Sequence, residues 1–161
     1  MNKYRFASTS LRLAIVAIDI CIFVMLFLSF YTFSTSIMAF MSNPEEKIKM
    51  SFGFDNSTRE YYLNIDFYIV NDGFIDVNVK FDGFLSLVNG SIVKSSSTSG
   101  IIPPKNSLKL RLSFRFTESE ILMYDFVNNP PYLSLDFGFK AFFNLIGLKF
   151  HLSNIRLGGS R

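Results

Sequence analysis

Cysteine, histidine and tryptophan are almost missing from this chain, whose 161 residues include one Cys, one His and no Trp. A single cysteine cannot form a disulfide within the chain, so Cys21 gives no information about the redox compartment. One Cys and one His also exclude a metal cluster built from several thiolates or imidazoles of one copy. We therefore expect neither a resident metal nor a cofactor.

Two sequence motifs of enzymes are missing as well. There is no G-x-S-x-G nucleophile elbow and no glycine-rich phosphate loop. The one Gly-Gly pair lies in the closing "LGGSR", which we interpret as a flexible tail.

The net charge is +3 and the pI about 9.0, but Lys and Arg are scattered through 105–115 and 140–161. No basic run is long enough for a nucleic-acid patch. We expect a protein that is not an enzyme and does not bind nucleic acid.

One long apolar run follows the amino terminus. A bilayer core of ~30 Å needs about 20 apolar residues in a helix, and residues 13–33 supply them with Asp19 as the one interruption. The apolar pattern continues to Met41, and Asn43-Pro44 then ends the helix because proline cannot continue it. The prediction has three segments: a cytoplasmic stretch over 1–12, a transmembrane signal-anchor helix over 13–41 and a linker over 42–49.

Charges on the two sides of this run predict its orientation. Lys3, Arg5 and Arg12 precede it, whereas the charges in 45–49 roughly cancel. The positive-inside rule then places the amino terminus in the cytoplasm and the rest of the chain outside the cell membrane. A cleaved signal peptide is the alternative, with "STS" at 34–36 as its site. Signal peptides have an apolar part of about 7–15 residues, which is shorter than this run.

Asp19 is the one charged residue within the apolar run. A carboxylate inside a membrane helix costs a few kcal/mol on insertion scales, and it usually faces protein or water. Arg12 lies on the same helix face, seven residues earlier. Two interpretations stay open. Asp19 and Arg12 contact a polar group on a partner helix, or they form an interfacial pair at the cytoplasmic surface.

The remainder of the chain alternates apolar and polar residues with a period of two, which indicates half-buried strands. Five stretches show this pattern: 62–70, 74–82, 107–116, 132–140 and 146–152. We expect their apolar members to face a core, namely Leu63, Ile65, Phe67, Ile69, Ile75, Val77, Val79, Phe81, Leu108, Leu110, Leu112, Phe114, Phe116, Leu133, Leu135, Phe137, Phe139, Ile146, Leu148, Phe150 and Leu152.

Turn and capping signals separate the strands. "NDG" at 71–73 and "NG" at 89–90 predict hairpins, because Asn, Asp and Gly tolerate positive φ. Thr117 with Glu120 three residues later forms a capping box, which predicts one short helix over 117–126. About seven strands with one helix are typical of an all-β, fibronectin- or immunoglobulin-like β-sandwich. We place this domain outside the membrane over 50–157, with a tail over 158–161.

Four segments in this order resemble the LEA14-like family, also called the water-stress and hypersensitive-response (WHy) domain. They are "IDFYIVNDGFIDVNVKFDGFLSLVNG", "SSSTSGIIPPKNSLKLRLSF", the short helix, and "LSLDFGFKAFFNLIGLKFHLSNIRL". The Asn-Pro-Asn signature of plant members is replaced by "VNDG" at 70–73, as in archaeal membrane-anchored relatives. The resemblance implies a fibronectin-like sandwich without catalytic residues and roles that range from stress protection to lipid or protein binding.

Four aspartates, Asp66, Asp72, Asp76 and Asp82, invite a metal or acid–base interpretation. Asp76 and Asp82 are six residues apart, about 20 Å along a strand, and cannot share an ion. Asp66 and Asp76 could face each other across a hairpin and bind a cation such as Ca²⁺. No D-x-D-x-D spacing supports such a site. We favour the solvated face of a sheet and expect no metal-binding residue.

Other candidate positions have equally plain interpretations. His151 takes an outward position on the last strand, which is typical of a surface histidine. The sequons at Asn56 and Asn89 fall in turns, which makes both candidate N-glycosylation sites of a glycoprotein, although sequons also arise by chance. The 20 Phe indicate either a large aromatic core or an exposed patch that includes Phe84, Phe142 and Phe143.

Three functions remain after these exclusions, all of them without catalysis. The first is a structural or accessory subunit of a cell-envelope or membrane complex, with protein partners at the membrane helix and the sandwich surface. The second is a subunit of an extracellular filament or surface layer, built by strand exchange or edge pairing. The third is a module that binds lipid or another small ligand inside the sandwich.

Overall fold

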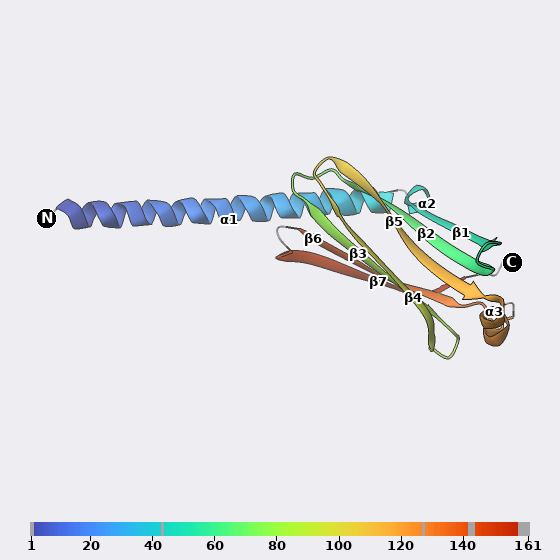
Figure 1. The fold of residues 1–161 in the computed structure, drawn as a ribbon. Helices are drawn as coiled ribbons and strands as arrows, with labels where there is room; N and C mark the ends of the chain where they lie inside the picture. The colour runs from blue at the N-terminus through green and yellow to red at the C-terminus, as the bar shows by residue number, and fades with distance from the viewer. Residues whose placement is uncertain (1, 43, 127, 142–143, 158–161) are drawn as a thin grey trace.

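The chain folds into one long helix and a β-sandwich (Figure 1). The structure is a computed structural model that describes residues 2–42, 44–126, 128–141 and 144–157. Its elements in chain order are α1 (Asn2–Ser42), α2 (Pro44–Lys47), β1 (Ile48–Asp55), β2 (Glu60–Asn71), β3 (Val77–Ser86), β4 (Ile92–Ile102), β5 (Asn106–Thr117), α3 (Glu118–Tyr124), β6 (Tyr132–Ala141) and β7 (Ile146–Arg156). The predicted fold class is confirmed.

Two antiparallel sheets form the sandwich, one in the order β1-β2-β5 and the other in the order β4-β3-β6-β7. β4 and β5 lie against each other and close one side of the sandwich. β1 and β7 are the edge strands of the opposite side, and each is paired along one edge only in the described part of the chain. We call this opposite side, between β1 and β7, the open side.

The period-two alternation produces the core, as predicted for most strands. Buried residues come from β2, β3, β5 and β6 in strict alternation with exposed or half-buried ones. Phe67, Phe81 and Phe137 meet edge to face at the centre, with ring centroids 4.7 Å, 5.0 Å and 5.8 Å apart. Edge-to-face contacts add to the free energy gained by burial, because ring edges and faces carry opposite partial charges.

Helix α1 has a bare part and a packed part. Every residue in 10–27 is exposed, whereas Ser29, Thr32 and Ser36 farther along are fully or almost fully buried. The bare part rises about 27 Å at ~1.5 Å per residue, close to the ~30 Å of a bilayer core. Mean hydropathy reaches 2.8 in the segment Ser10–Phe40. One apolar helix of this length followed by a sandwich fits a membrane-anchored domain.

The packed part of α1 lies against the half of the open side nearer the bare part of the helix. We call it the membrane-side half, because it would face a membrane spanned by residues 10–27. Ile37 and Phe40 contact the core, and the Phe40 ring lies 6.1 Å from that of Phe137. The connection between β2 and β3 holds the helix on its other flank: the Phe74 amide donates to Thr32 Oγ1 over 3.2 Å, and the Phe74 and Tyr31 rings are 5.5 Å apart. The helix and the sandwich therefore form one packed unit.

The predicted hairpin at "NDG" is wrong. β2 pairs with β1 and β5, whereas β3 pairs with β4 and β6, so residues 71–76 cross from one sheet to the other. Asn71 is buried, and its Nδ2 donates to the carbonyls of Ile75 and Ile102, each over 2.8 Å. These bonds hold the chain across the end of the sandwich. β3 consequently begins at Val77 rather than near residue 74.

Two other local predictions are confirmed. Gly90 has φ +83° in the tight turn between β3 and β4, which pair as a hairpin. Thr117 caps α3 and forms the capping box with Glu120, so the short helix begins at the predicted residue. Its left-handed C-cap at Asp125 ends it slightly before the predicted boundary.

Candidate functional site

The aspartates singled out in the sequence are distributed over both sheets. Asp66 lies on β2, where Arg111 Nε and Lys109 Nζ on β5 approach its carboxylate to 2.6 Å and 2.9 Å. The hydrogen bond from Arg111, followed by that from Lys109, lowers the pKa of Asp66 to about 2. Asp66 is thus the centre of a surface ion cluster, and both of its carboxylate oxygens have partners.

Asp66 and Asp76 do not face each other, so the cation site considered for this pair, which the sequence did not favour, has no geometric basis. Asp76 precedes β3 in the other sheet and is exposed, and the residue paired with Asp66 on β1 is Lys49. Asp72 is also exposed, and its backbone carbonyl accepts a hydrogen bond from Lys105. Within the described residues, no group of three or more His, Cys, Asp and Glu side chains is arranged to hold a metal ion.

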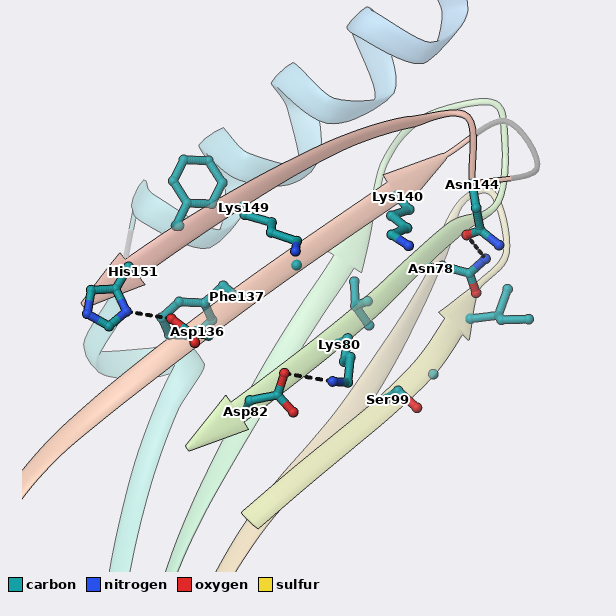
Figure 2. Close-up of a pocket in the computed structure, with 15 residues that line it drawn as sticks. Asn78, Lys80, Asp82, Ser99, Asp136, Phe137, Lys140, Asn144, Lys149 and His151 are labelled. Atoms are coloured by element: carbon teal, nitrogen blue, oxygen red, sulfur yellow. Dashed lines mark hydrogen bonds and ion pairs between the residues drawn. The ribbon is translucent and has the colours of Figure 1, made fainter. Parts of the chain in front are cut away.

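Asp82 belongs to a row of polar residues on the outer face of the second sheet (Figure 2). The register places Asp82 between Ser97 and Asp136, and Asp136 in turn opposite His151. Ser97 Oγ donates to Asp82 over 2.6 Å, and His151 Nδ1 lies 2.5 Å from Asp136 Oδ1. We call these four residues the polar row.

Ion pairing offsets the repulsion between the two carboxylates of the polar row. Like charges directly opposite each other on neighbouring strands are destabilising. Lys80 Nζ binds Asp82 over 2.8 Å, and this hydrogen bond, with the one from Ser97, lowers the pKa of Asp82. Three members of the row, Asp82, Asp136 and His151, line a concave surface of about 820 Å³ together with Lys140 and Lys149. Such a surface can bind a polar solute through its ammonium and amide groups.

The polar row shows no arrangement for nucleophilic catalysis. A serine or cysteine nucleophile requires a base within hydrogen-bond reach. In the described part of the chain, no hydroxyl or thiol forms a hydrogen bond with His151, whose side chain is 61% exposed. His151 therefore lies where the sequence placed it, on the surface, but it has a carboxylate partner that the sequence did not reveal.

The open side of the sandwich is the other unusual feature, because its walls are apolar and exposed. Leu148, Phe150 and Leu152 on β7 are 42%, 41% and 47% exposed, so the prediction that these three lie in the core is wrong. Opposite them on β1, Met50, Phe52 and Phe54 are 49%, 69% and 46% exposed. The cause is architectural: none of the described strands lies between β1 and β7, so no strand covers these inner faces.

Two apolar hollows lie along the open side. The membrane-side groove, of about 570 Å³, runs between α1 and β7 and is lined by Leu26, Phe30, Ser34, Ile37, Met38, Ile146 and Leu148. The distal pocket, of about 580 Å³, lies near α3 and is lined by Phe52, Tyr61, Leu63, Leu85, Phe116, Ile121, Phe126, Pro131 and Leu157. Both volumes fall within the ~300–1,000 Å³ of typical ligand sites.

Asp19 and Arg12 both lie on the bare part of α1 and are exposed. If residues 10–27 span the membrane, Asp19 lies about 13 Å from either end of that segment at ~1.5 Å per residue. The structure records no ion pair between Asp19 and Arg12 among the described side chains. With residues 10–27 as the span, Asp19 lies near the middle of the span rather than at one of its ends.

The remaining candidates lie where their sequence context suggested. Asn56 and Asn89 are exposed in turns, and their glycosylation stays a prediction. Phe84 is half-buried, while Phe142 and Phe143 fall outside the described residues. In the described part of the sandwich, the exposed phenylalanines are instead Phe52, Phe54, Phe74 and Phe150.

Comparison with known proteins gives no family for this chain. No family model matches it, and no curated protein matches it. Among solved structures, a protein from Archaeoglobus fulgidus is 12% identical with a TM-score of 0.45, over 68% of this chain and 96% of that one. A sporulation control protein from Bacillus subtilis is 10% identical with a TM-score of 0.28, over 67% of this chain and 47% of that one.

A β-glucuronidase from Bacteroides uniformis is also similar over part of its length. It is 6% identical with a TM-score of 0.41, over 67% of this chain but only 13% of the enzyme. Scores of this size carry no argument about activity, ligands or partners.

Proposed function

We propose that this chain is a non-catalytic, single-span membrane protein that acts as an accessory subunit of a cell-envelope or membrane complex. Its amino terminus lies in the cytoplasm and its sandwich outside, as the flanking charges predict. The similarity to the LEA14-like family is part of this proposal, and it rests on the sequence segments alone.

The position of Asp19 is the observation that carries the proposal. The side chain is exposed near the middle of the bare helix, where its neighbours are apolar and no ion pair with a described residue of its own chain reaches it. A carboxyl group at that depth costs about 2.5–3.5 kcal/mol on insertion scales. A polar group on a neighbouring helix would offset that cost, and such a group has to come from another subunit.

Replacing Asp19 with Leu tests the proposal. We expect Asp19→Leu to enter the membrane at least as well as the natural chain but to lose its partner. Purification of the tagged full-length protein in mild detergent, followed by native electrophoresis and mass-spectrometric identification of co-purified proteins, measures both. Cys21→Leu is the matched control, because Cys21 is an exposed residue of the same helix without charge. Unchanged migration of Asp19→Leu would contradict the proposal.

A filament is the second candidate, and the two free edges favour it. β1 and β7 each leave one edge unpaired among the described strands, and both border the open side. Exposed edges of this kind are templates for pairing with another chain. Electron microscopy of the purified protein would show open-ended homopolymers if this candidate is correct.

A further inference from the structure

We propose that the open side of the sandwich binds the hydrocarbon chain of a membrane lipid, which enters from the bilayer through the membrane-side groove. The starting observation is that both walls of the open side present alternate apolar side chains to solvent: Met50, Phe52 and Phe54 from β1, and Leu148, Phe150 and Leu152 from β7. Exposed apolar surface of this extent marks a site for an apolar partner.

The membrane-side groove joins this surface to the apolar face of the bare helix. Its lining includes Leu26, which lies on the bare part of α1, and continues through Phe30 to Met38. On the other wall are Ile146 and Leu148, the first inward residues of β7. When residues 10–27 lie in the bilayer, the groove therefore opens at the level where lipid chains begin, and apolar side chains line it from that level onward.

The length of the path matches a lipid chain. From Ile146 to Leu152 the inner face of β7 extends about 20 Å at ~3.3 Å per residue. One lipid chain fills one leaflet, which is half of the ~30 Å hydrocarbon core. The face of β7 is thus long enough to accompany such a chain over its whole length, and the distal pocket lies beyond it.

The packing of α1 favours a hydrocarbon chain over an inserted strand. Ile37 and Phe40 occupy the membrane-side half of the open side and contact the core there. A strand added along β7 would have to run straight through this half to complete its hydrogen bonds. A lipid chain needs no hydrogen bonds and can bend past the helix. Ser34 is the one polar residue among those that line the groove in the described part of the chain.

The natural chain contains no tryptophan, so the fluorescence of one introduced Trp reports on its own site alone and can show whether a lipid chain occupies the open side. Phe150 is paired with Phe137, which contacts Phe40, and Phe40 lies thirteen residues beyond Phe27. A residue at this level is about 20 Å from the end of the bare helix at ~1.5 Å per residue. A label on the end of a lipid chain reaches it only if the chain leaves the bilayer.

The experiment uses the full-length Phe150→Trp protein in nanodiscs that contain phosphatidylcholine with a spin label near the chain terminus. His151→Trp is the matched control, since it lies one residue away at the same height but on the outer face of β7. With half of the sites occupied by labelled lipid, we expect the emission of Phe150→Trp to fall roughly twofold. The emission of His151→Trp should stay at its value in unlabelled nanodiscs.

A second substitution tests the route. Phe150→Trp combined with Leu148→Arg places a charge in the membrane-side groove and should remove the quenching. Circular dichroism and thermal unfolding confirm that the sandwich of this variant is intact.

Three results overturn the inference: equal quenching of both reporters, no quenching of Phe150→Trp in a folded protein, or emission of Phe150→Trp that depends on protein concentration and assembly size instead of on labelled lipid. The last result would identify a second copy as the occupant. None of these results depends on Asp19.

Discussion

At the scale of single residues, the carboxylates on the outer faces of both sheets have Lys, Arg or His partners. Asp66 is 16% exposed and has two cationic partners, while the polar row places Asp82 and Asp136 opposite each other with Lys80 and His151 as partners. These pairs contribute modestly to stability, because Arg111 and Lys109 are more than half exposed and screened by solvent.

Asp66→Asn tests the strength of its ion cluster through the dependence of stability on pH. The pKa of Asp66 is about 2 in the folded chain, against an ordinary value of 3.8. Its stabilisation is therefore fully present above about pH 4 and is lost as the pH falls through about 2. After allowance for screening, we expect Asp66→Asn to lower the free energy of unfolding by about 1 kcal/mol at pH 7.

The measurement is chemical denaturation of the natural and Asp66→Asn proteins at several pH values. The difference between the two should disappear near pH 2, where the carboxyl of the natural protein becomes protonated as well. A difference that stays constant from pH 7 to pH 2 would show that Asn disturbs packing and that the charge is not responsible.

At the scale of elements, the contact between α1 and the connection from β2 to β3 fixes the position of the helix against the sandwich. Gly73 lies so close to Thr32 that a Cβ on residue 73 would overlap the threonine side chain. The Phe74 amide and ring then bind the same turn of α1. The "NDG" segment that looked like a hairpin turn is thus the clamp that holds the helix against the sandwich.

Gly73→Ala should loosen this clamp. Overpacking of a tight contact costs about 1–3 kcal/mol, so we expect amide hydrogen exchange in residues 28–42 to become roughly 5–160-fold faster. Gly138→Ala is the matched control, because the nearest atom to its added Cβ, the Lys80 carbonyl oxygen, is at 3.5 Å, an ordinary contact. Unchanged exchange in 28–42 for Gly73→Ala would contradict the clamp.

The strands show what a sequence can predict at this scale. Period-two patterns located β2, β5 and β6 almost to the residue, because each has one buried and one wet face. β1 was not predicted, although Ile48, Met50, Phe52 and Phe54 alternate in the same way. The burial of β7 was predicted wrongly for a related reason. Alternation identifies the inward face of a strand, but it does not tell whether another strand covers that face.

At the scale of the whole molecule, the features that required the structure all depend on contacts between distant segments. Asp136 and His151 come together through the register of β6 and β7, and neither residue has a local motif. The open side and its two hollows follow from the order of strands in both sheets. The long apolar helix could be predicted from the sequence, but the division of α1 at residue 27 depends on where the sandwich begins to cover it.

Two truncations test this division. Removal of residues 1–27 should leave the sandwich close to its natural stability, since that segment is exposed wherever its burial is described. Removal of residues 1–42 also takes away Ile37 and Phe40, which pack on the core. We expect this second deletion to lower the free energy of unfolding by about 2–4 kcal/mol. Thermal unfolding followed by circular dichroism compares them, and equal stability would show that α1 does not support the sandwich.

The unbroken course of α1 has a mechanical consequence. The helix continues from the bare segment into the clamp at Thr32 and the contact of Phe40 with Phe137. Over residues 2–42 the helix has no break between the bare part and these contacts, so the bare part and the sandwich move as one rigid body. A membrane helix tilts by up to about 40° as the surrounding bilayer becomes thinner. If residues 10–27 span a membrane, the thickness of that bilayer sets the tilt of the helix and with it the direction in which the sandwich points.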